Sequence, residues 1–330
     1  MNIYEQGRYK KLFIIPVVML VILLFFATRL TYGMDFQGGT RITSPLENDV
    51  DVAEMEMEIG EEFNLVDADV RKTEGVERVL IVSYVGNRDI MQMEELMEEG
   101  NYEEVISRAR EITGELELED LEEEERAQEY LSAAEEEINS QLTSYISEKT
   151  GAEEGEMSID SIGAAMGAQF LDQSRNAIIA AVIFISILVF YFFRKILVSL
   201  AVFQSPVYDI VFGLGAMGLF QIPLTLGTIA ALLMVIGYSI DSDIMLTMKV
   251  LESKEGTPEE RANKALKTGI TMAVTTITAL SALLIVAYLT QIELLVSISL
   301  ILVLGLIGDA ITTWFINAPI MIWESKRTSK

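Results

Sequence analysis

The sequence predicts a polytopic α-helical membrane protein that carries one folded α+β domain outside the membrane. Two observations support this fold class. Hydrophobic residues make up 51% of the 330 residues, yet the formal net charge is -26. No single globular class combines these properties, so the apolar and the acidic residues must lie in different parts of the chain.

Six apolar segments are long enough, or nearly so, to cross about 30 Å of hydrocarbon as helices. They are predicted as transmembrane helices at residues 12–30, 175–193, 196–220, 224–248, 268–289 and 294–323. The first follows the stretch at 1–11, which resembles the start of a signal peptide. Because no small-residue cleavage site closes this segment, we interpret it as an uncleaved anchor.

Lys and Arg residues beside the predicted spans indicate their orientation. Basic residues precede the first span, join the second to the third, lie in the loop at 249–267 and end the chain at 324–330. The short loops after the third and fifth spans contain neither Lys nor Arg. Both termini are therefore predicted to be cytoplasmic and residues 31–174 extracytoplasmic, in a protein of the cell membrane.

The predicted outer segment, residues 31–174, contains most of the charge. It holds 39 of the 50 acidic residues but only nine of the 24 basic ones. Concentrated salt would screen the resulting repulsion, which indicates a high-salt habitat rather than a cationic partner. The chain has no cysteine, so this domain depends on its apolar core without disulfides.

Alternating apolar residues predict a small sheet within the outer segment. The predicted order is a strand at GGTRITSPL, a helix at DVAEMEMEIGEEF, strands at LVDADVRKT and VERVLIVSYVG around a turn at Glu74 and Gly75, and a short last strand at EMSIDSI. This β-α-β-β order with a final strand predicts a ferredoxin-like domain. A Glu-rich stretch at 113–150 is predicted to be a helical insertion.

The chain enters this domain through the motif GMDFQGGT. Its pattern residues are Gly33, Asp35, Phe36, Gly38, Gly39 and Thr40. The glycines permit tight or left-handed backbone, and Asp35 can accept hydrogen bonds from exposed amides of the turn. The motif closely resembles the signature that opens the first outer domain in the SecD and SecF family, the paired membrane proteins of the Sec export pathway.

Five later stretches are similar to the same family. They are SIGAAMGAQFLDQSRNAIIAA, SPVYDIVFGLG, GYSIDSDIML, TMAVTTITAL and GDAITTWFINAPI. Tyr208 precedes Asp209 where the family has His before Asp. In the third stretch, Asp241 takes the place of an Asn in bacterial members and Asp243 that of a Thr. The resemblance covers nearly the whole chain and implies an archaeal-type member, related to resistance-nodulation-division transporters.

Polar residues within the apolar segments are candidates for a proton or ion route. The candidates are Asp209, Asp241, Asp309, Asp243, Tyr238 and Thr275. Clustered carboxylates in a low dielectric favour protonation near neutral pH, and ionisable residues at membrane depth are functional by default. Asp241 and Asp243 point about 200° apart on a helix. We expect Asp241 to face the bundle together with Asp209, and Asp243 to matter less.

The resemblance implies a subunit of the Sec protein-export machinery. Its implied partners are a SecD-like protein, the Sec translocon, an unfolded exported polypeptide and membrane lipid. Two alternatives are a proton-driven exporter of small molecules or lipids from the same superfamily and a non-transporting translocon assembly factor. The chain has no nucleotide-binding glycine motif, so no nucleotide site is indicated. We also expect no enzymatic activity, cofactor, metal or nucleic-acid partner. The sequence leaves the coupling ion, proton or sodium, open.

Overall fold

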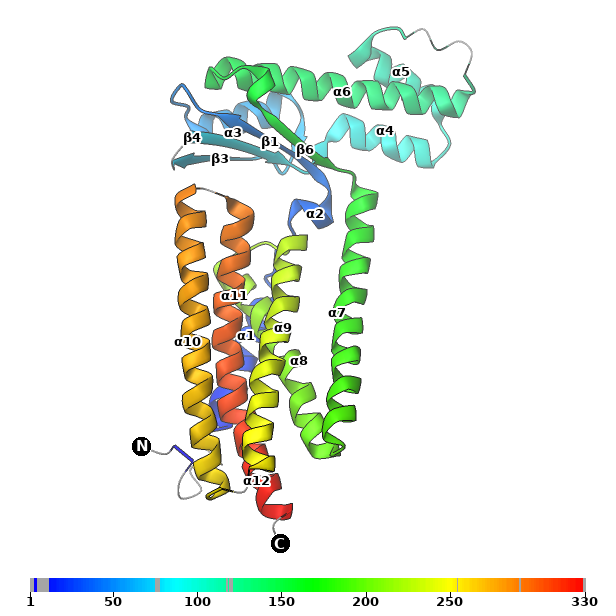
Figure 1. The fold of residues 1–330 in the computed structure, drawn as a ribbon. Helices are drawn as coiled ribbons and strands as arrows, with labels where there is room; N and C mark the ends of the chain where they lie inside the picture. The colour runs from blue at the N-terminus through cyan, green and yellow to red at the C-terminus, as the bar shows by residue number, and fades with distance from the viewer. Residues whose placement is uncertain are drawn as a thin grey trace. The chain divides into compact units, whose positions relative to one another are not determined.

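The computed structural model describes residues 3–4, 12–74, 78–116, 118, 121–253, 255–290 and 292–328 (Figure 1). The chain divides into two compact units. The first combines Met1–Phe36 with Gln169–Lys330, and the second is Gln37–Ala168.

The first unit is a bundle of apolar helices. Its elements are α1 (Ile14–Ala27), α2 (Met34–Gln37), α7 (Ala164–Phe193), α8 (Ile196–Phe220), α9 (Leu226–Thr247), a π-helical turn at Met248–Glu252, α10 (Pro258–Thr290), α11 (Glu293–Thr312), a second π-helical turn at Thr313–Asn317 and α12 (Ala318–Thr328). Five of the described helical stretches are long and apolar enough to cross a membrane. The helical membrane architecture is therefore confirmed, while α1 is shorter.

Two helices begin earlier than the apolar segments predicted from sequence. Helix α7 begins at Ala164 instead of 175, and α10 begins at Pro258 instead of 268. The apolar segment measures only what hydrocarbon can cover, whereas the helix continues through polar residues beyond it. Pro258 starts α10 because proline fits the first turn, where its missing N–H is not needed.

Close helix contacts in the first unit occur at glycines. A Cβ atom at Gly215 of α8 would lie 2.5 Å from the Leu23 carbonyl oxygen of α1, and one at Gly308 of α11 would lie 2.6 Å from the Phe212 ring. Small residues at such contacts allow membrane helices to pack tightly. By contrast, only 6% of the most apolar stretch of α7, and likewise 6% of that of α10, is buried within the chain.

The second unit contains a four-stranded antiparallel sheet in the order β3-β4-β1-β6. Its elements are β1 (Gly39–Pro45), α3 (Val52–Glu62), β3 (Asp69–Glu74), β4 (Arg78–Tyr84) and β6 (Ser158–Ile162), with a separate pair of β2 (Leu65–Val66) and β5 (Gly86–Asn87). The first strand, the helix, β4 and the short last strand agree with the prediction. The predicted strand at LVDADVRKT is instead divided into β2 and β3, which belong to different sheets, and Asp67 between them has a φ of 50°. Gly75 of the predicted turn lies outside the described residues.

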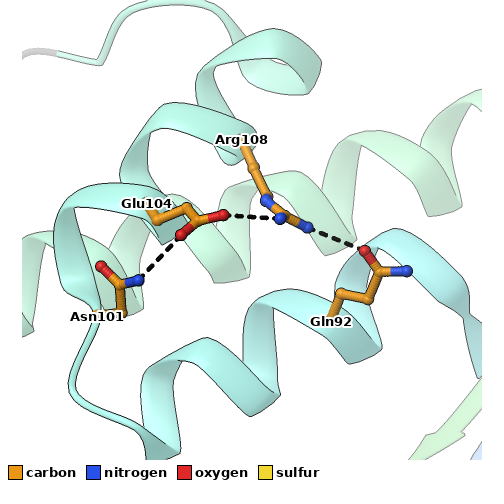
Figure 2. Close-up of polar contacts among 4 residues, drawn as sticks. All are labelled: Gln92, Asn101, Glu104 and Arg108. Carbon is orange, nitrogen blue, oxygen red and sulfur yellow. Dashed lines mark hydrogen bonds and ion pairs between the residues drawn. The ribbon is translucent and has the colours of Figure 1, made fainter.

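Three helices complete the second unit: α4 (Arg88–Glu98), α5 (Tyr102–Thr113) and α6 (Glu123–Thr150). Arg108 links α5 to α4, since it donates to Glu104 at 2.7 Å and to Gln92 at 2.9 Å, while Asn101 donates to Glu104 at 2.9 Å (Figure 2).

Helix α6 contributes to two apolar cores. Its first half packs Tyr130 against α4 and α5, and its second half packs Leu142 and Ile146 against the sheet. The helical insertion therefore differs from the predicted range of 113–150. Its extra core begins with α4, and the last turns of α6 cover the sheet. The apolar stripe of α6 runs without a break through both cores, so periodicity could not divide it.

Candidate functional site

Three aspartates meet inside the helical bundle, and we call them the carboxylate cluster: Asp209 on α8, Asp243 on α9 and Asp309 on α11. Their exposed fractions are 1%, 1% and 4%. The three helices pack against one another. The cluster therefore lies within the bundle and not on its surface.

Asp243 and Asp309 share a single hydroxyl donor. The Thr313 hydroxyl lies 3.2 Å from Asp243 Oδ1 and 3.1 Å from Asp309 Oδ1. A threonine hydroxyl has one hydrogen, so it can donate to only one of the two oxygens at a time. A proton on one carboxyl group would complete this network, because that group could then donate to the threonine oxygen.

The π-helical turn after α11 brings two polar side chains to Asp243. Besides Thr313, the Asn317 amide donates to Asp243 Oδ1 at 2.7 Å. Asn317 in turn accepts a hydrogen bond of 2.9 Å from Gln204 of α8. π-helical turns are frequent at functional sites because they shift the direction of side chains within a helix. Here the turn joins α8, α9 and α11 through one polar network.

Asp209 has no hydrogen-bond partner among the described residues. Both of its carboxylate oxygens are buried. Ser205 and Ser239 lie 3.2 Å apart between α8 and α9 and are fully buried. An ionised carboxylate without a partner is costly to bury. Asp209 also interacts electrostatically with Asp309, so the site combines like charges that desolvation disfavours.

The positions of Asp241 and Asp243 are the reverse of the sequence-based expectation. Asp243 is buried, whereas Asp241 is exposed on α9. The buried stripe of α9 includes Ser239, Asp243 and Thr247, which are four residues apart and therefore share one helix face. The hydroxyl groups of Ser239 and Thr247 on this face were the sequence signal that could have identified Asp243 as the buried carboxylate.

Two other candidates also lie outside the cluster. Tyr238 is 36% exposed and lies on the same face of α9 as Asp241. Thr275 is exposed on α10, where its hydroxyl donates to the Thr271 and Met272 carbonyl groups. Thr275 therefore does not join the polar network within this chain, and its place on an ion route stays a prediction.

Sequence reasoning missed three residues of the polar network: Gln204, Ser205 and Thr313. Gln204 and Ser205 precede Asp209 by about one helical turn, which is the spacing that places side chains on neighbouring positions of one face. Thr313 lies four residues after Asp309, and this spacing places both side chains on one helix face, so helical spacing could have identified it. Tyr208 points elsewhere and donates to the Pro16 carbonyl oxygen of α1 at 3.3 Å.

The first half of the GMDFQGGT motif holds the beginning of α9. Asp35 accepts a hydrogen bond of 2.8 Å from the Leu226 N–H, and the Gly33 N–H donates to the Leu224 carbonyl oxygen at 2.7 Å. A Cβ atom at Gly33 would lie 2.6 Å from the Thr225 side chain. Asp35 therefore satisfies an exposed amide, as expected, but this amide belongs to a distant helix and not to its own turn.

The rest of the motif, residues 36–40, includes the point along the chain where the first unit ends and the second begins. Phe36 is buried among apolar residues of the helical bundle. Gly38 and Gly39 have φ values of 78° and 131°, which glycine adopts at low cost. Thr40 begins β1 and lies 3.0 Å from the Ser161 hydroxyl of β6. Within the described residues, no group of three acidic or other metal-binding side chains is placed to hold a metal ion.

Comparison with known families gives two matches. Residues 142–327 match the family described as "Protein export membrane protein SecD/SecF, C-terminal". Residues 23–48 match the "SecD/SecF GG Motif", which includes the junction described above. The two matches together include every residue of the carboxylate cluster.

Individual proteins give the same similarity. The chain is 32% identical over 317 residues to the protein-export membrane protein SecF of Methanocaldococcus jannaschii, covering 95% of this chain and 94% of that protein. It is 41% identical over 166 residues to SecF of Haloferax volcanii, covering 50% of this chain and 58% of that protein.

The fold is similar to that of a solved structure. SecDF from Thermus thermophilus, a translocon-associated membrane protein, aligns with a TM-score of 0.69 and 17% sequence identity. The alignment covers 99% of this chain but 39% of the SecDF chain. At this identity the similarity concerns the fold alone.

Proposed function

The chain belongs to the SecD/SecF family of protein-export membrane proteins, and we propose that its carboxylate cluster couples an ion gradient to polypeptide export. Its role in this family is that of a SecF-type subunit of Sec protein export, a transport protein and not an enzyme. The hydroxyl of Thr313 carries the proposal, because it bridges two buried carboxylates that compete for its one hydrogen.

A shared proton would make the cluster sensitive to the ion gradient. When Asp243 and Asp309 are both ionised, Thr313 can bond only one of them, and like charges remain buried together. Adding a proton removes one charge and supplies the missing donor. Protonation and release would therefore change the contacts between α9 and α11. Asp209, which has no described hydrogen-bond partner, is the next carboxylate available to the proton.

The GMDFQGGT motif would transmit a change in the position of α9 along the chain towards the second unit. Asp243 and the amide bonded to Asp35 both belong to α9, with Leu226 at the beginning of the helix. A helix moves as a rigid element over this length. A shift near Asp243 would therefore displace the Leu226 N–H group, which donates its hydrogen bond to Asp35. The next strand along the chain, β1, belongs to the outer domain.

The proposed topology has six spans, with α1 as the short sixth span in addition to the five long helices. Lys and Arg residues favour cytoplasmic termini and an extracytoplasmic second unit, in the cell membrane. The antiparallel order β3-β4-β1-β6, with α3 and α6 as its two helices, supports a ferredoxin-like outer domain. The acidity of this domain supports a high-salt habitat.

A SecD-like protein is the proposed partner in the membrane. Asp241 and Tyr238 lie on an exposed face of α9, and Thr275 lies on an exposed face of α10. An ionisable side chain at membrane depth is costly against lipid and is usually covered by protein or water. The partner would cover this face, the remaining surface would contact lipid, and the translocon and unfolded polypeptide would complete the assembly.

Affinity purification and flux measurements test this function together. The tagged chain, purified from its native membrane in concentrated salt, should carry a SecD-like protein and the translocon with it. Export of a reporter into vesicles should fall when the ion gradient is collapsed, and a protonophore compared with a sodium ionophore identifies the ion. Export that is unaffected by both ionophores would refute ion coupling.

A further inference from the structure

Strand β6 forms an open edge of the sheet in the second unit. Among the described strands it pairs only with β1, through the register Ile42↔Ile159 and its neighbours. Ser158, Asp160 and Ser161 are exposed, and Ile159 is 47% exposed. Backbone groups on the outer side of such a strand are available to pair with a further strand.

The opposite edge, strand β3, has a different character. Four of its six residues are charged, and Arg71 forms an ion pair with Asp69 at 2.7 Å. Charged side chains are a common means of preventing an edge strand from pairing with other chains. Strand β6 has Asp160 as its single charge and contains no proline. The two edges therefore differ in protection, and β6 is the one suited to accept a strand.

A cavity of about 280 Å³ adjoins the end of β6. Its lining comes mainly from β1, β4, β5, β6, α4 and α6 and includes Thr40, Tyr84, Glu94, Glu135, Asn139 and Ser161. Two of these are carboxylates, and none of the described lining residues is Lys or Arg. The backbone of β6 therefore leads directly into an acidic cavity without a basic side chain.

The two carboxylates of the cavity have no basic side chain beside them among its described lining residues. Burial raises the pKa of Glu94, and the nearby carboxylate of Glu98 adds to this effect. Burial also raises the pKa of Glu135, and Glu94 adds to it. Both glutamates line the cavity and remain partly exposed, so a ligand can reach them. A cationic group between them would relieve their repulsion and form charge-assisted hydrogen bonds.

We propose that β6 and the adjoining cavity bind an extended polypeptide segment, which pairs with β6 as a further strand and places a Lys or Arg side chain between Glu94 and Glu135. This rests on the proposed function, in which an exported polypeptide would pass the outer domain unfolded. Backbone pairing provides affinity that does not depend on sequence, whereas the cavity favours basic segments. The charge of the ligand is complementary to that of the whole domain.

The binding test uses the full chain in lipid nanodiscs and fluorescent peptides. One short Thr- and Val-rich peptide has a central Lys, a matched peptide has Gln instead, and a third carries the Lys but is N-methylated at alternate residues. The Lys peptide should bind about fivefold more tightly than the Gln peptide, the size expected for a partly exposed ion pair. N-methylation should abolish binding because it removes the N–H donors of the added strand.

Charge variants separate the cavity from the general acidity of the domain. The double variant Glu94→Gln and Glu135→Gln should reduce affinity for the Lys peptide to that for the Gln peptide. Its control, Glu95→Gln and Glu136→Gln, removes the same charge at adjacent exposed positions outside the cavity. This control should bind both peptides as the unchanged chain does.

Cross-linking locates the added strand. Because the chain has no cysteine, Ser158→Cys on β6 and Thr73→Cys on β3 each introduce a unique thiol. A peptide containing one Cys should form a disulfide with the β6 thiol under mild oxidation and not with the β3 thiol. Cross-linking at β3 instead would overturn the proposal, and so would a β6 cross-link to the membrane partner that the peptide cannot displace.

The outcomes also separate this site from the proposed ion coupling. Peptide binding is measured without a membrane potential, so it does not require the carboxylate cluster. Equal affinity for the Lys and Gln peptides, while export still depends on Asp243, would refute the site alone. Selective binding of the Lys peptide by a chain whose export ignores the ion gradient would support the site and refute the coupling.

Discussion

Replacing Asp243 with Asn tests the carboxylate cluster directly, and Asp241→Asn provides a control two residues away. Asp243 Oδ1 receives both described hydrogen bonds, whereas its Oδ2 is buried without a described partner. Asn retains the first oxygen and replaces the second with an amide nitrogen. This position is therefore unpaired in both chains, so the substitution should cost less than the roughly 1–3 kcal/mol of a newly unsatisfied buried group. Asp241→Asn, at an exposed position, should also have little effect on folding.

The functional effect should be larger than the effect on folding. Asn cannot change its charge, so Asp243→Asn removes one proton-carrying group from the cluster. A proton that crosses about 100 mV supplies about 2.3 kcal/mol, which corresponds to a factor of about 50 in rate. We expect Asp243→Asn to reduce the rate of potential-stimulated export by up to this factor. Asp241→Asn should stay within about twofold of the unchanged chain, as surface substitutions usually do.

The assay measures export of a reporter by inverted vesicles that contain the chain and its SecD-like partner. Rates with and without an imposed potential are compared after normalisation to the amount of the chain. A second variant, Thr313→Val, keeps the shape of the side chain but removes the shared hydroxyl, and it should also reduce the stimulation. The reasoning fails if Asp243→Asn retains full stimulation, or if Asp241→Asn loses as much of it.

Three further predictions concern other parts of the molecule. Asp35→Ala should destabilise the helical bundle by about 1 kcal/mol, because the Leu226 N–H loses a charged acceptor at a helix N-terminus. Thermal unfolding in detergent measures the loss of stability, and an unchanged unfolding midpoint would contradict this prediction. Glu135→Gln should stabilise the outer domain at neutral pH, because the raised pKa of Glu135 means that folding disfavours its ionised form. This gain in stability should vanish below pH about 4.3, where the unchanged glutamate is protonated in both the folded and the unfolded state. A gain that persists below this pH would exclude the charge explanation. A thiol at Ser132 should react with an impermeant reagent from outside intact cells while one at Ser253 should not, and the reverse pattern would contradict the proposed topology.

The sequence alone determined the architecture, because its signals are local. Apolar segments long enough to cross a bilayer identify membrane helices wherever they occur, and alternation identifies the strands of the small sheet. The motif around Gly33 and Asp35 was also readable. Its glycines and its carboxylate indicated a constrained junction, although the acceptor role of Asp35 toward Leu226 joins residues that are 191 positions apart.

Only the tertiary structure decided which carboxylates belong together. Asp241 and Asp243 both interrupt the same apolar segment, and helical spacing shows that they face different ways but not which face is buried. That choice depends on α8 and α11, which cover the side of α9 that carries Asp243. Thr313 follows Asp309 by one helical turn, and its hydroxyl reaches Asp243 because α9 packs against α11 and the turn that follows it. Contacts between distant helices are properties of packing, so the pattern of a single helix cannot contain them.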